Sequence, residues 1–241
     1  MEQGQEGGVQ EARDLPFMRI GGFQQFSLID YPGKMAAIVF TQGCNFRCGY
    51  CYNSQLACPK LFEEPLDESM VLEFLESRKG RLEGVVVTGG EPTIQQGLAD
   101  FLRQLKSMHY AVKLDTNGSN PDVLASVIER KLVDFIAMDL KTSPANYGKA
   151  VGIKIDFDRI KSSIDLIINS GLRHQFRTTL VRPLCSEEDL KEIQNLIGAS
   201  RQYVLQLFMP SSKIIDQSLL AQPQYTLNEV QHLRLLFQRG F

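Results

Sequence analysis

Short apolar segments alternate with longer amphipathic segments along this chain of 241 residues. Several of the apolar segments are rich in Val, Ile or Phe, as buried parallel strands tend to be. They span residues 35–41, 84–88, 111–115, 133–139, 175–180 and 203–209. About six strand–helix units in succession predict an α/β fold with a parallel sheet and right-handed crossovers. Such a sheet is either open or curled into a barrel.

Capping residues mark the expected starts of the helices between these strands. Asn, Asp, Ser and Thr are favoured there because their side chains accept hydrogen bonds from free backbone N–H groups. Proline is favoured directly after the cap. The expected caps are Asp67, Asn120 followed by Pro121, Asp156, Ser186 paired with Asp189, and Thr226 paired with Glu229.

The composition fits one globular domain over residues 15–241. Hydrophobic residues make up 43% and charged residues 22%, close to the globular average. Residues 1–14 are rich in Gly, Gln and Glu, so we expect a disordered tail there.

Charge and hydropathy argue against nucleic acid and membrane as partners. The formal net charge of −2 lacks the basic excess of a nucleic-acid-binding surface. The apolar runs are far shorter than the roughly 20 residues that cross a bilayer. The first residues lack a signal peptide pattern. We therefore expect a cytoplasmic protein.

Three of the five cysteines, Cys44, Cys48 and Cys51, lie within eight residues of one another. Clustered thiols in a reducing compartment indicate metal ligands rather than disulfides. A structural zinc site takes four ligands, commonly as two pairs, and no second pair or nearby His is present. Three thiolates on a [4Fe–4S] cluster would leave one iron open to bind a small molecule. Cys58 and Cys185 stand apart and are expected to be ordinary small apolar residues.

Polar motifs follow successive predicted strands. The cysteine cluster follows the first strand and residues 89–93 (GGEPT) follow the second. Residues 115–118 (DTNG) end the third strand and residues 139–141 (DLK) end the fourth, while Arg177 lies on the fifth. Because the carboxyl ends of parallel strands converge, these motifs can surround one pocket.

The Cys44-x3-Cys48-x2-Cys51 spacing, followed by Tyr52 and Asn53, resembles the signature of the radical S-adenosylmethionine (SAM) superfamily. The GGEPT and DLK motifs fit the same superfamily over roughly residues 35–210. The resemblance implies a partial (β/α)6 TIM-like barrel and a radical SAM domain over residues 15–241. It also implies that Cys44, Cys48 and Cys51 bind a [4Fe–4S] cluster and act in catalysis through it. The reduced cluster would cleave SAM to methionine and a 5′-deoxyadenosyl radical.

The resemblance assigns roles around the SAM ligand to residues from four motifs. The backbone of Gly89 and Gly90, which carries no side chains, would let the ammonium group of the methionyl part of SAM approach closely. The Glu91 carboxylate would accept a hydrogen bond from that ammonium group. A tight turn is the structural alternative for this motif. The remaining SAM-binding candidates are Tyr50, Tyr52, Asp139, Leu140, Lys141 and Arg177.

Three of these assignments have specific alternatives. Lys141 is suited to the SAM carboxylate, although a solvated salt bridge to Asp139 explains the DLK motif as well. Arg177 either contacts the ligand or balances a carboxylate. Asp115, Thr116 and Asp139 resemble a monovalent cation site, while turn chemistry explains the adjoining Asn117 and Gly118 equally well.

Residues 27–34 (SLIDYPGK), leading into residues 41–48 (TQGCNFRC), resemble the activating proteins of anaerobic ribonucleoside-triphosphate reductase. This implies that the protein forms a glycyl radical on a partner enzyme in a transient complex, with a flavodoxin- or ferredoxin-type reductant. Two spare cysteines are too few for an auxiliary cluster. Tyr52 stands where related activases often carry His, and residues 209–211 (MPS) depart from the basic-Pro-Gly sequence of the family.

Two other functions remain open from the sequence. One is a radical SAM enzyme that acts on a small molecule such as a deazapurine precursor, which would turn over without a partner protein. The other is a metal-binding module without catalysis, which would hold zinc without sulfide.

Overall fold

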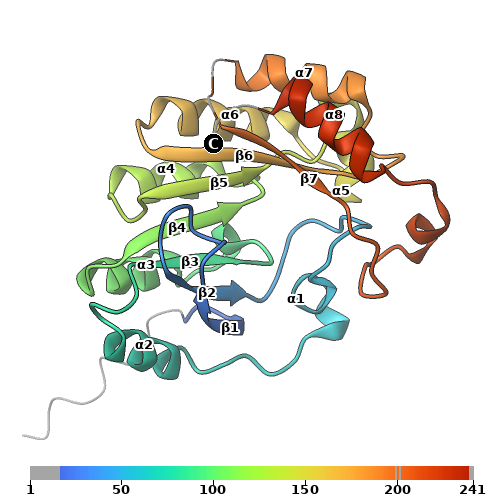
Figure 1. Ribbon diagram of the computed structural model, residues 1–241. Coiled ribbons are helices and arrows are strands. Elements are labelled where there is room, and N and C mark those ends of the chain that lie inside the picture. Colours follow the sequence, from blue (N-terminus) through green and yellow to red (C-terminus); the bar gives the residue numbers. More distant parts are fainter. Residues whose placement is uncertain (1–16, 199, 201, 239–241) are drawn as a thin grey trace, which may run out of the picture.

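A computed structural model describes residues 17–198, 200 and 202–238, so the tail expected over residues 1–14 lies outside the described residues. One seven-stranded sheet, in the order β1 to β7, forms the centre of the molecule (Figure 1). Its strands are β1 (Ile20–Ser27), β2 (Ala36–Thr41), β3 (Gly84–Gly89), β4 (Ala111–Thr116), β5 (Phe135–Asp139), β6 (Arg173–Leu180) and β7 (Tyr203–Leu207). Strands β2 to β7 pair in parallel, which confirms the six predicted strands.

Strand β1 was not predicted from the sequence. It pairs antiparallel with β2 at one edge of the sheet, from Ile20 opposite Thr41 to Ser27 opposite Ala36. Its sequence, IGGFQQFS, contains two adjacent glycines and two glutamines, which are poor strand formers. Pairing with the strongly apolar β2 therefore overrides the weak local preference.

Five of the six longer helices begin at the residues that the sequence predicts, and α3 was not predicted. They are α2 (Glu68–Ser77), α3 (Leu98–Ser107), α4 (Pro121–Glu129), α6 (Phe157–Asn169), α7 (Glu187–Ile197) and α8 (Leu227–Phe237). The Asp67 and Asp156 side chains accept hydrogen bonds from the backbone N–H groups of Ser69 and Asp158. Complete capping boxes start α7, through Ser186 and Asp189, and α8, through Thr226 and Glu229. These caps explain the starts of α2, α6, α7 and α8. Asn120 precedes α4 as predicted but makes no cap hydrogen bond, because its side-chain amide donates to the Thr93 hydroxyl.

Shorter helical turns connect these elements. They are α1 (Ser54–Ala57), α5 (Tyr147–Val151) and the 3-10 turns η1 (Pro59–Leu61), η2 (Pro92–Ile94), η3 (Pro144–Asn146) and η4 (Gln217–Ala221). Within the described ranges, no helix is long and apolar enough to cross a membrane.

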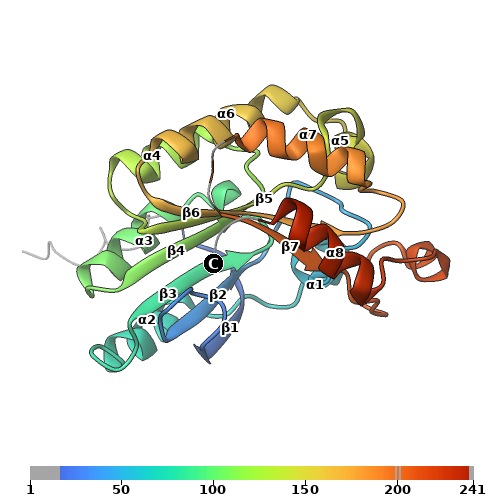
Figure 2. The same cartoon turned by 45° about the horizontal axis from the view of Figure 1, so that its top comes forward.

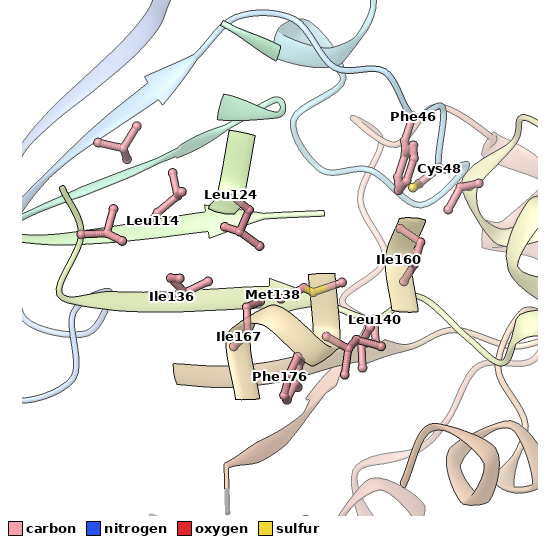
Figure 3. Packing of buried hydrophobic residues seen from close by; sticks show 14 of the residues in the cluster. Phe46, Cys48, Leu114, Leu124, Ile136, Met138, Leu140, Ile160, Ile167 and Phe176 are labelled. Atoms are coloured by element: carbon pink, nitrogen blue, oxygen red, sulfur yellow. The ribbon is translucent and has the colours of Figure 1, made fainter. Parts of the chain in front are cut away.

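The main core lies between the outer face of the sheet and the helices. Figure 2 shows α4, α6 and α7 lying along one side of the sheet. Alternate residues of the strands point toward these helices, as Leu114, Ile136 and Phe176 do, and each is fully buried. Ile160 and Ile167 of α6 pack into the same cluster (Figure 3). This layer leaves the other face of the sheet free to curve around a central cavity.

A smaller cluster closes the concave face at the amino ends of the strands. The loop from β1 to β2 carries Tyr31 into this position, where its ring meets Phe135 of β5 edge-on at 5.9 Å. Tyr31 is 2% exposed, and Ile38 and Val86 belong to the same cluster. Burial raises the pKa of Tyr31 to about 12, with Asp134 adding to the effect. The SLIDYPGK segment therefore plugs the end of the partial barrel that lies away from the carboxyl ends of the strands.

Candidate active site

A cavity of about 430 Å³ opens at the carboxyl ends of the parallel strands. It brings together residues from the ends of six strands, β2 to β7, and from the loops that follow them, and the order of the motifs predicts the first five of these positions. Of the sequence-predicted site residues, Cys44, Cys48, Tyr50, Cys51, Tyr52, Gly89, Gly90, Glu91, Asp115, Thr116, Asp139, Lys141 and Arg177 line it.

Leu140 is the predicted site residue that the structure places elsewhere. Its side chain is 1% exposed and packs in the main core together with Phe176 (Figure 3). Leu140 lies between Asp139 and Lys141, and alternation along extended backbone turns it to the opposite side. It contributes a backbone link, because its N–H donates to the carbonyl of Arg177 at 2.8 Å. Its side chain therefore lies outside the cavity lining, and the predicted role of Leu140 in SAM binding would have to be met by its backbone.

The cysteine loop is held in place by contacts from several parts of the fold. The Arg47 guanidinium donates to the carbonyl oxygens of Cys44 and Phe46, both at 2.6 Å. The N–H of Arg47 donates to the carbonyl of Val151 in α5, and the N–H of Asp216 donates to that of Gly49. The protein thus shapes this loop through its own hydrogen bonds.

The three clustered thiols have raised proton affinities. Burial raises the pKa of Cys44 to about 12 and that of Cys48 to about 11, and it also raises the pKa of Cys51. Iron is bound by thiolates, so loading a metal must displace these protons. Among the described residues, no three His, Cys, Asp or Glu side chains converge as ligands of a single metal ion would. A [4Fe–4S] cluster instead spreads its thiolates over several iron atoms. Three free thiols around one cavity fit that donor set.

Gly89 and Gly90 pack against the strand and loop that lead into the cysteines. A Cβ on Gly90 would meet the Gly43 carbonyl oxygen, and a Cβ on Gly89 would lie 2.4 Å from the backbone nitrogen of Thr41. Gly89 also has a φ of 111°, which favours glycine. The missing side chains therefore make room for neighbouring backbone. The expectation that the bare backbone lets a ligand approach stays a prediction. The backbone of both residues still lines the cavity.

Glu91 joins the loops after β3 and β4. Its buried carboxylate accepts from the backbone N–H and hydroxyl of Thr93, the hydroxyl of Thr116 and the backbone N–H of Asn117. Burial raises its pKa, and these hydrogen bonds oppose that rise. Four protein donors already satisfy the carboxylate, so its role as acceptor for a ligand ammonium gains no support.

Asn45, which the sequence analysis did not select, connects the cysteine loop to the same region. Its amide donates to the Ser119 hydroxyl at 2.8 Å and accepts from the Asn117 amide at 2.9 Å. Asn117 therefore has a bonding role beyond that of a turn residue. The position of Asn45 directly after Cys44 was the one signal in the sequence that could have identified Asn45 as a site residue.

Five alternating charges form a chain of ion pairs, and four of the five residues line the cavity. The Arg177 guanidinium lies between two carboxylates, with Nε 2.7 Å from Asp139 Oδ1 and Nη1 3.0 Å from Asp115 Oδ2. Lys141 Nζ lies 3.1 Å from Asp139 Oδ2, and Lys113 pairs with Asp115 at the other end. The sequence analysis missed Lys113, although it shares a strand face with Asp115 and is 2% exposed.

The ion pairs agree with one of the two alternatives for Arg177, that it balances carboxylates. Burial alone would raise the pKa of Asp139, but Arg177 and Lys141 hold it well below its ordinary value. Burial alone would lower the pKa of Lys141, but Asp139 raises it well above its ordinary value. Arg177 balances the two carboxylates. The monovalent cation stays a prediction.

Two tyrosines contribute differently to the wall. The hydroxyl of Tyr50 is buried and, within the described part of the chain, has no hydrogen-bond partner. It can therefore bond to a bound group or a water. Tyr52 stacks on Phe208 at 5.8 Å between ring centroids, and its hydroxyl accepts from the N–H of Met209 at 2.6 Å. Tyr52 is thus fixed to the loop after β7.

Cys58 and Cys185 lie outside the residues that line the cavity. Cys185 is 2% exposed in the main core, as expected for a small apolar residue, and Cys58 is partly buried.

Comparison with known proteins assigns the chain to a family. The sequence model of the radical SAM superfamily matches residues 38–197. A protein of Methanocaldococcus jannaschii named as a glycyl-radical enzyme activating enzyme is 31% identical over 220 residues, covering 89% of each chain. The pyruvate formate-lyase-activating enzyme of Clostridium pasteurianum is 27% identical over 188 residues, covering 74% of this chain and 76% of its own.

The fold agrees with that assignment. The crystal structure of Streptococcus suis SuiB bound to precursor peptide SuiA superposes with a TM-score of 0.66 at 14% identity. It covers 83% of this chain, which in turn spans 44% of that structure. At such low identity the likeness concerns the fold alone. Together with the family match, the architecture is the partial barrel predicted from the sequence, and the chain is a radical SAM enzyme of the glycyl-radical enzyme activating type.

Proposed function

We propose that this protein generates a glycyl radical on anaerobic ribonucleoside-triphosphate reductase, in a transient complex. A [4Fe–4S] cluster, when bound and reduced, supplies the electron that cleaves SAM to methionine and a 5′-deoxyadenosyl radical. The observation that carries the proposal is that three free thiols and a fixed set of charges face the same cavity. The protein itself binds, orients and shields the reactants.

The residues divide this work according to their chemistry. Cys44, Cys48 and Cys51 would hold the cluster, each losing a proton as it binds iron. The Lys141 ammonium, held charged by Asp139, would bind the SAM carboxylate through a charge-assisted hydrogen bond. The free Tyr50 hydroxyl would bond a polar atom of the bound ligand. The Gly89–Gly90 backbone would border the ligand while it holds the cysteine loop in position.

The choice of partner rests on similarity to activating enzymes and on the SLIDYPGK and TQGCNFRC segments. The first segment plugs the barrel at the far end of the strands through Tyr31, so it would not touch a partner's glycine at the cavity. Its support for the choice of partner is the sequence resemblance alone. A glycine loop must leave after activation, which favours a small interface and a weak complex. A flavodoxin- or ferredoxin-type protein would supply the electron.

Two finer assignments accompany this proposal. Residues 15–241 would act as one radical SAM domain. The protein would work in the cytoplasm, where reducing conditions keep thiols free, as all five cysteines are here.

Electron paramagnetic resonance tests the proposal. The reductase is mixed anaerobically with reconstituted protein, SAM and reductant, and a glycine-centred doublet is expected. The same reductase with its radical-bearing glycine replaced by Ala is the control and should give no signal. Formation of 5′-deoxyadenosine without a radical on any of several glycyl-radical enzymes would contradict the proposal and favour a small-molecule substrate.

A further inference from the structure

The carboxylates that line the cavity outnumber its lining cations. Apart from the thiols, the described lining holds three carboxylates, of Glu91, Asp115 and Asp139, and two cations, Lys141 and Arg177. An uncompensated charge in a partly enclosed site is costly. It would also repel the carboxylate of an anionic ligand group. The lining therefore needs one more positive charge, which a bound cation or another side chain can supply.

Lys113 supplies a third cation from deeper in the barrel, outside the lining. On β4, Lys113 and Asp115 share the concave face, while Leu114 between them points toward the helices (Figure 3). The Lys113 ammonium pairs with the Asp115 carboxylate, and the Lys113 side chain is only 3% exposed. With Lys113 included, the carboxylates and the cations of this region balance.

The surroundings of Lys113 direct its charge to Asp115. Its neighbours across the sheet are Val86 on β3 and Phe135 on β5, and both belong to the apolar cluster that closes the barrel. The ammonium lies 6.0 Å from the centre of the Phe135 ring, at the limit of a cation–π contact. Within the described residues, its one ion pair is with Asp115. A lysine buried in this way is tolerated because that carboxylate compensates its charge.

The carboxylate oxygens of the predicted monovalent cation site are already bonded to protein cations. Oδ1 of Asp115 accepts from Lys113, and its Oδ2 accepts from Arg177. Oδ1 of Asp139 accepts from Arg177, and its Oδ2 accepts from Lys141. A metal ion placed on these oxygens would have to displace one of three positive side chains or lie beside them. Repulsion between like charges opposes the second arrangement.

The third predicted ligand of that cation, Thr116, is also committed. Its hydroxyl donates to Glu91 Oε1 at 2.7 Å and accepts from the N–H of Gly118 at 3.1 Å. Both bonds hold the turn after β4 against the loop after β3. The side-chain donor set of Asp115, Thr116 and Asp139 therefore suits a site that is neutralised from within the protein.

We infer that Lys113 takes the place of a monovalent cation as the counter-charge of Asp115, so that SAM binding needs no added Na⁺ or K⁺. Its ammonium carries the same single charge on a compact group and is held on β4. With Asp115 neutralised by Lys113, Arg177 can hold Asp139 as well. Lys113 is thus a positioning residue that acts through Asp115 and Arg177. The inference opposes the cation site predicted from the sequence, and it rests on the proposed function only in taking SAM as the ligand.

Exchange of monovalent cations tests the inference. The reconstituted protein is desalted into choline chloride, whose cation is too large for the site. SAM affinity is then measured by anaerobic calorimetry in choline, Na⁺ and K⁺ chloride at equal ionic strength. The wild-type protein should bind SAM equally in all three salts. Lys113→Met should bind SAM about tenfold more weakly in choline chloride and regain affinity with Na⁺ or K⁺. Lys79→Met removes an exposed cation that pairs with Glu76, and this matched control should behave as the wild type.

Urea denaturation of the cluster-free protein in the same salts gives a readout that depends on neither cluster nor SAM. The stability of the wild-type protein should be the same in K⁺ and choline chloride. Lys113→Met should be more stable in Na⁺ or K⁺ chloride than in choline chloride, because an ion bound only by the folded state stabilises it. A purely structural lysine would give a loss of stability that no cation restores.

The outcomes separate this inference from the proposed function. A wild-type protein that loses SAM affinity in choline chloride and regains it with Na⁺ or K⁺ would overturn the inference, whether or not the variant folds. A folded Lys113→Met variant that responds to neither cation would overturn it as well. Cation-independent SAM binding without a radical on any glycyl-radical enzyme would overturn the proposed function alone. Absence of SAM binding in every salt would overturn both.

Discussion

Gly90 lies directly on the main chain of Gly43, so closely that a Cβ on Gly90 would stand 1.9 Å from the Gly43 carbonyl oxygen. The N–H of Glu91 donates to that same carbonyl at 2.8 Å. Gly43 directly precedes Cys44. The loop after β3 therefore fixes the start of the cysteine loop through backbone contact.

Gly90→Ala should impair cluster assembly as well as SAM binding, because the added Cβ must displace the backbone that leads into Cys44. We expect less iron and sulfide per protein after anaerobic reconstitution, and a free energy of unfolding lowered by about 1–3 kcal/mol, the usual cost of overpacking. Gly22→Ala on β1 is the control, since its Cβ would meet Phe40 at an ordinary 3.5 Å. Full cluster content in the Gly90 variant would show that the contact does not position the ligands.

Single replacement of Cys44, Cys48 or Cys51 by Ala should abolish cluster binding and SAM cleavage, since each supplies one thiolate. The fold should persist, because the loop is also held by Arg47, which circular dichroism can verify. Cys58→Ala and Cys185→Ala should keep the cluster. Loss of iron from the Cys58 variant alone would contradict this ligand assignment.

Arg177→Met should weaken SAM binding and stability together, because it removes the cation between Asp115 and Asp139. Removing one partner of a buried ion pair costs about 3–5 kcal/mol, which urea denaturation can measure. SAM affinity, measured by anaerobic calorimetry on the reconstituted protein, should fall by tenfold or more as Lys141 loses its fixed geometry. Arg103→Met removes an exposed cation that pairs with Asp100 and should change neither quantity appreciably.

Asp189 should make stability depend on pH in the acid range. Burial alone would raise its pKa, but hydrogen bonds from Ser143, Asn146 and the N–H of Ser186 lower it to about 2. Because the folded-state pKa lies below the unfolded value, the stabilisation is complete above about pH 4 and is lost as pH falls toward 2.

Asp189→Asn should therefore lower the free energy of unfolding by about 2 kcal/mol at pH 7, with the difference shrinking as pH approaches 2. Denaturant titrations at several pH values provide the measurement. Asp165→Asn, an exposed position on α6, serves as the control. A difference that stays constant from pH 7 to pH 2 would rule out linkage through Asp189.

Tyr31→Ala should destabilise the fold by about 3–5 kcal/mol, because it opens a cavity beneath Phe135 at the closed end of the barrel. Tyr31→Phe keeps the ring and should cost less than about 1 kcal/mol. Urea denaturation of both variants measures the difference. Equal stability of the two variants would mean that the ring does not plug the barrel.

Local sequence patterns were sufficient for the parallel strands and the helix starts. The apolar residues of β2 to β5 have few alternatives to burial, and caps such as Thr226 act through bonds to residues three positions away. Strand β1 was not predicted because its own residues favour a strand only weakly, and it forms through pairing with β2 in the folded structure. The cysteine spacing and the order of the motifs also placed the cavity at the correct end of the sheet.

The sequence by itself predicted the ligand set of Cys44, Cys48 and Cys51, since three thiols at this spacing in one loop suit few other sites, and it determined that they lie together at the cavity. Only the tertiary structure decided how the remaining site residues are used. Arg177 and Asp115 lie 62 positions apart, and Gly90 and Gly43 lie on different loops, so no local pattern reveals that they touch. The structural contacts of Glu91, Gly90 and Leu140 with distant parts of the chain were missed for the same reason. The sequence determines the chemistry of each side chain. Its contacts depend on parts of the chain that are distant in the sequence and that only folding brings close to it.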